Sequence, residues 1–306
     1  MRALLVTNPK ATATSPRVRD VIINALSAHT QLEVAHTDHR GHAIELGARA
    51  TEQRYDLVIA LGGDGTVNEL VNGLLSRGVG PHVPALAAVP GGSANVFART
   101  LGTSNDPIEA TGQLLEALAA GRERHISLGQ MEGRWFVFTA GIGFDAGVVH
   151  GVELRRGDGR KASPNLYART AVRDFLARTR RRTRLTVSTA DGVVADDAFL
   201  CVATNTTPWT YYKKRPVQLT PQASYDRGLD LFALGKVGPI AIGRLLWQVT
   251  RTEPNPRGRR VTLLHDLPGL EITAPAPVPV QVDGDYAGDY ERVRLDSAPN
   301  ALRVIC

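Results

Sequence analysis

A short stretch of this chain combines three glycines, a carboxylate and polar side chains, in the order Leu61-Gly62-Gly63-Asp64-Gly65-Thr66-Val67-Asn68-Glu69. Apolar residues precede it, as in a buried parallel strand, and a helical pattern follows. Glycine has no Cβ atom, so the backbone N–H groups of such a turn can approach an anion closely. Thr66 is expected to cap the helix, whose positive end would then point at that anion. The stretch predicts a phosphate-binding turn, and an ordinary strand-to-helix turn is the alternative.

Asp64 indicates what else this turn would bind. A carboxylate beside a polyphosphate repels it unless a cation lies between them, so Asp64 predicts Mg²⁺ bound together with a nucleotide. The stretch lacks the Gly-Lys-Ser/Thr ending of a Walker loop and differs from the Rossmann fingerprint.

A second loop of the same layout follows the next predicted strand. Gly91 and Gly92 precede Ser93, whose hydroxyl could reach a phosphate, and a helix is expected after Asn95. Two such loops on neighbouring strands are harder to explain as accident than one. Together they predict two walls of one crevice.

The elements that position these loops follow a strand–helix rhythm over residues 1–128. Open parallel sheets bind ligands beyond the carboxyl ends of their strands, so Asn8 and Thr37 should join the two glycine loops there. Strands are expected at 3–7, 32–37, 56–61 and 85–89, with helices around 18–26 and 43–50 and after residue 66.

The pattern changes after about residue 126 to short strands separated by turns, which predicts a mostly antiparallel second domain. One helix is expected within it, over about 163–176, with Ser163 as its cap and Pro164 at its first position. The expected strands are 135–140, 185–188, 199–204, 229–234, 260–264, 270–272 and 278–282.

Composition restricts the class of protein. The chain has 306 residues, 43% hydrophobic and 22% charged, which is ordinary for a globular protein of two domains. Its two cysteines lie far apart, and Cys201 falls in an apolar strand, so a buried thiol is expected and not a disulfide. No run approaches the roughly 18 apolar residues that a membrane-spanning helix needs. The first residues are interpreted as a strand and not a signal segment, which favours a cytoplasmic location.

Positive charge is concentrated in one region. The formal net charge is +6, but residues 152–184 alone hold eleven Lys or Arg against three acids. A second segment, 209–215, mixes aromatic residues with cations. Residues 155–184 and 209–215 therefore predict peripheral contact with an anionic membrane surface, and a solvated charged face is the alternative. No recognition motif supports a nucleic-acid partner.

The first loop resembles the signature of the diacylglycerol kinase catalytic domain family, which includes bacterial lipid kinases and sphingosine kinases. NAD kinases share its first five residues and usually diverge after the threonine, so Val67, Asn68 and Glu69 favour the lipid branch. The resemblance implies an α/β N-terminal domain with a parallel sheet, 1–128, and a mostly antiparallel β-sandwich C-terminal domain, 129–290. The last strand, within 291–306, is expected to return to the first domain.

The resemblance also implies which residues contact ATP. Compared with the family pattern, this chain has Ser93 in place of a threonine and Val96 in place of an aspartate. Residues 8–12 stand where the family has an Asn-Pro-Xaa-Xaa-Gly nucleotide loop, and Ala11 or Thr12 replaces its glycine. The segment Thr37, Gly41, His42 and Ala43 resembles the family's threonine and Gly-His-Ala. The implied ATP-binding residues are Asn8, Pro9, Thr37, Gly62, Gly63, Asp64, Gly65, Thr66, Val67, Asn68, Gly92 and Ser93.

Near the C-terminus, Asp283-Gly284-Asp285 resembles the family's Asp-Gly-Glu motif. The resemblance implies that Asp285 accepts the proton of the substrate hydroxyl. Together with Asp64, which is expected to act through Mg²⁺ and the phosphates, it is an expected catalytic residue. The alternative is that Asp283 and Gly284 simply form a type I′ hairpin turn.

Residues 225–231 resemble a family segment in which an acid and nearby carbonyl groups hold a structural Mg²⁺. The matching positions are Asp226 and the carbonyl groups of Ala223 and Gly228, with Arg227 interrupting the usual Asp-Gly pair. Asp226 as an ordinary turn acid is the alternative.

Taken as a whole, the resemblance implies a peripheral membrane enzyme that uses ATP and Mg²⁺ to phosphorylate a lipid hydroxyl, with diacylglycerol as the expected substrate. A sphingoid-base kinase and a NAD kinase are the enzymatic alternatives. A nucleotide- and membrane-binding protein without turnover is a third. Either a monomer or a homodimer is compatible with the sequence.

Overall fold

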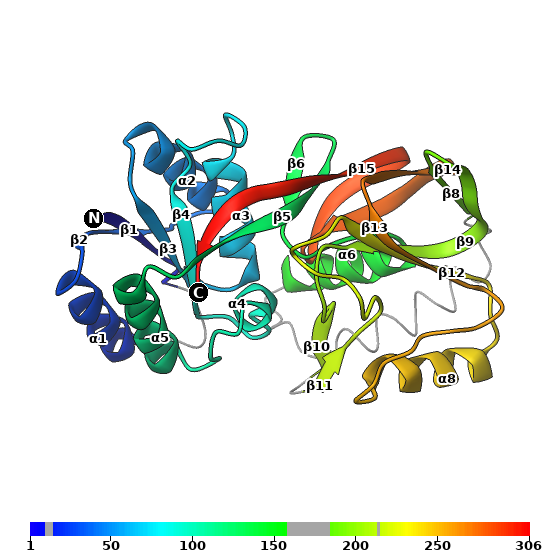
Figure 1. The fold of residues 1–306 in the computed structure, drawn as a ribbon. Coiled ribbons are helices and arrows are strands. Elements are labelled where there is room, and N and C mark those ends of the chain that lie inside the picture. The colour runs from blue at the N-terminus through cyan, green and yellow to red at the C-terminus, as the bar shows by residue number, and fades with distance from the viewer. Residues whose placement is uncertain (10–14, 158–183, 213–214) are drawn as a thin grey trace. The chain divides into compact units, whose positions relative to one another are not determined.

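A computed structural model describes residues 1–9, 15–157, 184–212 and 215–306 (Figure 1). The expected helix over 163–176, most of the basic region 155–184, residues 213 and 214, and Ala11 and Thr12 lie outside the described residues. The chain forms two compact units, Met1–Leu128 with Pro299–Cys306, and Gly129–Ala298.

The first unit is a parallel sheet whose strands alternate with helices, which confirms the α/β class. The strand order is β2-β1-β3-β4-β15, and Val304 near the end of β15 pairs with Leu86 of β4. The elements are β1 (Arg2–Thr7), α1 (Pro16–Ser27), β2 (Gln31–His36), α2 (His42–Glu52), β3 (Leu57–Gly62), α3 (Asp64–Leu74), β4 (Ala85–Pro90), α4 (Val96–Thr100) and α5 (Pro107–Ala120).

Burial and caps explain these elements. Every residue of β3 is buried, as expected for a central parallel strand covered on both faces. Ser15 caps α1 by accepting from the Val18 N–H at 3.3 Å, with Pro16 at the first position. The sequence prediction omitted α5, although Asp106 caps it and Gly121 ends it in a left-handed conformation.

The second unit is largely antiparallel, as predicted. Its strands follow the order β13-β12-β9-β7-β14-β15, and β8 pairs with both β9 and β14, so they are joined in one continuous hydrogen-bonded series. The elements are β5 (Glu123–Met131), which begins in the first unit, β6 (Arg134–Phe136), β7 (Thr139–Gly143), α6 (Phe144–Gly157), β8 (Leu185–Thr189), β9 (Gly192–Thr204), β10 (Thr210–Tyr212), β11 (Arg215–Val217), β12 (Leu229–Gly235), α8 (Pro239–Thr250), β13 (Val261–Leu267), β14 (Gly269–Val282) and β15 (Asp285–Ile305).

Two details of this unit differ from the sequence prediction. The two short strands expected at 270–272 and 278–282 are one strand, β14, with a shift in register between Thr273 and Val278. Pro275 and Pro277 lie within that shift, where their missing N–H groups cost no ladder hydrogen bond. Helices α6 and α8 are additional to the single helix expected here.

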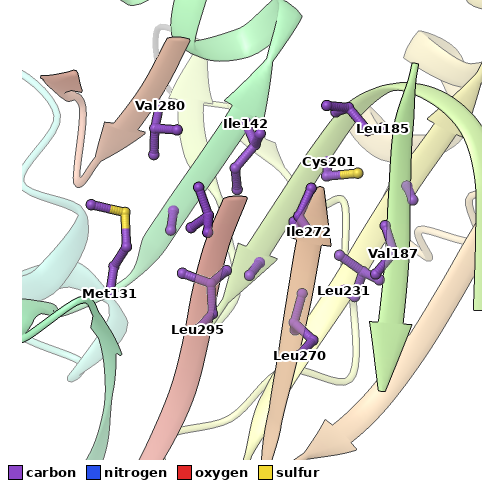
Figure 2. Packing of buried hydrophobic residues seen from close by; sticks show 14 of the residues in the cluster. Met131, Ile142, Leu185, Val187, Cys201, Leu231, Leu270, Ile272, Val280 and Leu295 are labelled. Carbon is purple, nitrogen blue, oxygen red and sulfur yellow. The ribbon is translucent and has the colours of Figure 1, made fainter. Parts of the chain in front are cut away.

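Figure 2 shows the core of the second unit, built from the apolar faces of its strands. Ile142, Leu231, Ile272 and Val280 are among its buried residues. Cys201 lies in this core as a free cysteine, and burial raises the pKa of its thiol to about 12, which confirms the expected buried thiol. Within the described residues, no helix is long and apolar enough to cross a membrane.

Candidate functional site

The two glycine loops lie against each other. The backbone N–H of Gly91 donates to the carbonyl oxygen of Gly62 at 2.8 Å. A Cβ atom at Gly92 would lie 2.7 Å from the Cα atom of Gly63, closer than real side chains come to a backbone. Glycine is therefore required at Gly91 and Gly92, where the second loop approaches the backbone of Gly62 and Gly63 at the carboxyl ends of β3 and β4.

The other two parallel strands end beside these loops. Asn8 donates its N–H to the Leu61 carbonyl at 3.3 Å, and Thr37 donates its N–H to the Thr7 carbonyl at 2.9 Å. The first unit therefore brings Asn8, Thr37 and the two glycine loops to one edge of its sheet. Pro9 and Ser93 are exposed there.

The sequence predicts that Thr66 caps α3, but the structure shows that it does not. The helix begins at Asp64 with Gly63 as its N-cap, and no side chain caps it, so Thr66 is already the third helical residue. Its side chain packs on Gly62, where a Cβ atom would lie 2.6 Å from the Thr66 hydroxyl oxygen. Thr66, Val67 and Asn68 are buried, whereas Gly65 is exposed with open space around it.

Asp64 connects the first loop to the helix after the second. Its Oδ1 atom accepts from the Phe97 N–H at 3.0 Å. Burial raises the pKa of this carboxyl, and the N–H groups of Phe97, Val96 and Asn95 act in the opposite direction. The carboxylate thus stabilises the N-terminus of α4, a role that sequence reasoning did not assign to it. Its contact with Mg²⁺ stays a prediction.

Asn95 closes the second loop. It has a left-handed backbone, φ +49°, as the N-cap of α4. Its side chain accepts from the Gly92 N–H and donates to the Gly92 carbonyl, both at 2.9 Å, and donates to Asn105 Oδ1 at 2.8 Å. Val96, at the position where the family usually has aspartate, is buried.

Glu69 performs a similar task for α2. Its two carboxylate oxygens accept from the N–H groups of Gly41 and Ala43, at 2.9 and 3.2 Å. A carboxylate at a helix N-terminus satisfies free N–H groups and complements the helix dipole. The two acids of the glycine-rich stretch therefore hold two neighbouring helices, which sequence reasoning missed because neither helix is adjacent to its acid in sequence.

Next to Thr37, three exposed or half-buried residues form a polar cluster. Asp38 contacts His39, and its Oδ1 atom lies 2.8 Å from Nδ1 of His42. The two imidazole rings stack with centroids 4.8 Å apart. The hydrogen bond with Asp38 raises the pKa of His39. Mutual hydrogen bonds and ion pairs account for this cluster, so His42 acts here as a polar contact near the start of α2.

The second unit contains the carboxyl-terminal acids. Asp283 and Gly284 both have positive φ, +49° and +85°, and connect the paired residues Val282 and Asp285, so the type I′ turn is present. Asp283 is buried, and its carboxylate accepts from the N–H groups of Val137, Phe138 and Thr139 at 2.6 to 2.9 Å. The turn therefore has a structural function and also presents Asp285, half-buried, at the start of β15. The role of Asp285 as proton acceptor stays a prediction.

A further acid, Asp145, is connected to this turn through the side chain of Gln281. Asp145, in the first turn of α6, accepts from Nε2 of Gln281 at 2.8 Å, and Oε1 of Gln281 accepts from the Gly284 N–H at 2.8 Å. Burial raises the pKa of Asp145 to about 6. A Cβ atom at Gly141 would lie 2.0 Å from Asp145 Oδ2, so the carboxyl group occupies the space that a side chain there would fill. Sequence reasoning gave Asp145 no role.

The expected structural metal site lies in one turn, 223–228. Asp226 is exposed, and its Oδ2 accepts from the Ser224 hydroxyl at 3.3 Å. The Gly228 N–H donates to Asp266 Oδ1 at 2.7 Å, and Arg227 pairs with the other oxygen of Asp266 at 3.1 Å. This carboxylate and guanidinium already hold the turn closed, and the Mg²⁺ expected at Ala223, Asp226 and Gly228 stays a prediction.

Comparisons with known proteins agree on one family. Residues 2–131 match the model of the diacylglycerol kinase catalytic domain. A protein named diacylglycerol kinase from Staphylococcus saprophyticus is 25% identical over 270 residues, which cover 88% of this chain and 83% of that protein. One from Staphylococcus aureus is 25% identical over the same length, covering 88% and 80%.

Solved structures show the same fold. A crystal structure of a diacylglycerol kinase from Bacillus anthracis aligns with a TM-score of 0.75 at 20% identity and covers 99% of this chain and 96% of that one. A second solved structure from the same bacterium aligns with a TM-score of 0.78 at 22% identity, with the same coverage.

Proposed function

We propose that this chain is a lipid kinase that phosphorylates diacylglycerol, because residues 2–131 match the model of the diacylglycerol kinase catalytic domain. This match supports a phosphotransferase that uses ATP. The finer assignment, transfer of the γ-phosphoryl group to diacylglycerol to form phosphatidic acid, is supported by relatives that bear this name over most of the chain.

The contact between the two glycine loops is the observation that carries the proposal. Gly62, Gly63, Gly91 and Gly92 meet backbone to backbone at the edge of a parallel sheet, where such folds bind nucleotides. Exposed Gly65 and Ser93 leave N–H and hydroxyl groups accessible to phosphate oxygens. In this proposal the crevice holds the phosphates of ATP and keeps the γ-phosphoryl group in place.

Phosphoryl transfer depends mainly on positioning and on charge neutralisation. Mg²⁺ carried in with ATP would neutralise the phosphate oxygens. The carboxylate of Asp285 would accept the proton of the lipid hydroxyl group. The hydroxyl oxygen would form a bond to the γ-phosphorus, and ADP would leave. Asp145 and Gln281 act through the turn and are positioning residues. Their hydrogen bonds support the proposed role of Asp285 by fixing the backbone next to it.

The lipid substrate implies a membrane partner. The basic segments 155–184 and 209–215 are proposed to contact anionic headgroups, consistent with their charge in the sequence. The enzyme would thus associate peripherally with the membrane from the cytoplasm.

Purified protein, labelled ATP and Mg²⁺ with separate panels of diacylglycerol, sphingosine and NAD test this function. We expect label in phosphatidic acid. Label in sphingosine phosphate alone would move the assignment to a sphingoid-base kinase, and label in NADP alone would assign a NAD kinase. ATP binding without transfer to any acceptor would refute an enzymatic function.

A further inference from the structure

Helix α8 is apolar on two sides, and unit 2 covers only one of them. On the inner side, Val249 is buried and Leu245 packs against the same cluster, which includes Phe232 and Leu234. The Gln218 N–H donates to the Val249 carbonyl at 2.8 Å, and Oε1 of Gln248 accepts from the Arg257 N–H at 3.1 Å. The helix is therefore held firmly in one orientation.

The outer side carries three large exposed apolar side chains. Ile240 is 89% exposed, Trp247 is 61% exposed and Leu246 is 58% exposed. Ile240 and Trp247 are seven residues apart, so they lie on one face two turns from each other. An exposed helix face with several large apolar side chains normally has an apolar partner, because exposing such residues together is unfavourable in water.

Positive charge borders this face. Residues 236–260 contain six Lys or Arg and one acid, Glu253. Lys236, Arg244 and Arg251 are exposed, and the guanidinium carbon of Arg251 lies 4.9 Å from the centre of the Trp247 ring. Tryptophan favours the headgroup level of a bilayer, and arginine places its apolar stem along acyl chains with its charge at the phosphates.

We propose that α8 docks this protein on an anionic bilayer, with Ile240, Leu246 and Trp247 inserted at the level of the headgroups and upper acyl chains. Arg244 and Arg251 pair with lipid phosphates beside them. This inference rests on the proposed lipid kinase function for its biological sense. It adds a docking element that the basic segments 155–184 and 209–215 do not include.

A second copy of the chain is a poorer occupant. A two-fold contact through α8 would bring the same cations of both copies together, whereas an anionic bilayer neutralises them. A single helix of 12 residues also offers little of the roughly 800 Å² per partner that a stable protein interface buries.

Co-sedimentation with vesicles, without ATP, tests the proposal. Wild-type protein should bind vesicles of phosphatidylcholine mixed with phosphatidylglycerol much better than phosphatidylcholine alone, and high salt should weaken that binding. Ile240→Ser together with Trp247→Ser should reduce partitioning by about tenfold or more. Arg244→Glu should reduce it by roughly fivefold or more, and only on anionic vesicles.

Val193→Ser is the matched control, because Val193 is 64% exposed in the same unit but far from α8 in sequence. It should bind vesicles as the wild type does. Circular dichroism and thermal unfolding of each variant check folding, which substitutions at exposed positions should preserve. Wild-type binding by both α8 variants would overturn the proposal, and so would a wild-type dimer that the double variant dissociates without any change in vesicle binding.

Phosphorylation of short-chain diacylglycerol in detergent micelles separates this proposal from the function itself. The α8 variants should keep wild-type turnover there, since the substrate needs no bilayer. A protein that binds vesicles through α8 but phosphorylates no lipid would refute the proposed function and leave the docking helix intact.

Discussion

The carboxylate of Asp64 accepts a hydrogen bond from the backbone N–H of Phe97, 3.0 Å away. Asp64 begins α3 and Phe97 lies in the first turn of α4, so the acid of the first glycine loop fixes the helix that follows the second. A substitution that removes both the charge and the acceptor oxygen of Asp64 would therefore change the charge beside the proposed nucleotide crevice and also the contact between α3 and α4.

Asp64→Ala and Asp64→Asn separate these two effects. Alanine removes the acceptor and should lower stability by about 0.5 to 2 kcal/mol as well as abolish turnover. Asparagine keeps an oxygen for the Phe97 N–H, so its thermal unfolding should stay close to that of the wild type while turnover is still lost. Normal turnover in Asp64→Asn would show that the carboxylate has only a structural task.

Gly92→Ala should weaken ATP binding. Its new Cβ atom would lie 2.7 Å from the Cα atom of Gly63, and because this backbone atom cannot rotate away as a side chain could, the two loops must separate. Calorimetric titration with ATP measures the effect, which we expect to exceed about tenfold in affinity, or about 1.4 kcal/mol. Gly112→Ala is the control: it lies in α5 with open space around it and should raise stability by about 0.5 to 1 kcal/mol.

Asp285→Asn should lower kcat far more than it lowers ATP affinity. The substitution removes the proposed proton acceptor and keeps the size of the side chain, while the two glycine loops proposed to bind ATP lie in the other unit. Steady-state kinetics and ATP titration on the same preparation measure both quantities. An equal loss of turnover and ATP affinity would point instead to misfolding.

Asp145 should make stability depend on pH. Its pKa rises from 3.8 to about 6 on folding, so the folded protein binds more protons than the unfolded chain between these values. Its contribution to stability is therefore lost as the pH rises from about 4 to about 6. Asp145→Asn should remove this loss and gain about 1 to 3 kcal/mol at pH 8, measured by denaturant unfolding from pH 4 to pH 8.

The matched control for this curve is Asp191→Asn, an acid-to-amide change at an exposed position of the same unit. Its unfolding curve should follow that of the wild type at every pH. Parallel curves for the wild type and Asp145→Asn would refute the proposed effect of Asp145 ionisation on stability.

Gln281→Ala should reduce kcat with little change in ATP affinity, because Gln281 and Asp145 are proposed to position Asp285.

Much of the fold could be predicted from the sequence, because buried parallel strands and antiparallel strands leave different periodic patterns. The helix caps could not. Asp64 and Glu69 reach the N-termini of α4 and α2, and such partners depend on how elements pack and not on local spacing. Thr66 was therefore assigned a cap that belongs to Gly63. Helix α8 was missed because its two apolar sides blur the single stripe that marks an ordinary surface helix.

Some residues of the candidate site could also be recognised in the sequence, and others could not. Glycine loops could be recognised because close backbone approach admits only one residue type, and this constraint is visible in sequence. Asp145 and Asp283 could not be recognised, since a buried acid resembles an exposed one until its surroundings are known. The sequence of Asp283 and Gly284 fits both a type I′ turn and a catalytic motif, and the turn is present with Asp285 beside it.

The pairing of β15 with β4 determines when the sheet of the first unit can be completed during synthesis of the chain. Pro299–Cys306 belongs to the first unit, so the second unit lies in sequence between β4 and the segment of β15 that pairs with it. This pairing can therefore form only after the whole second unit has been synthesised. A fragment ending at Leu128 would lack β15 and would leave one side of β4 as an unpaired edge.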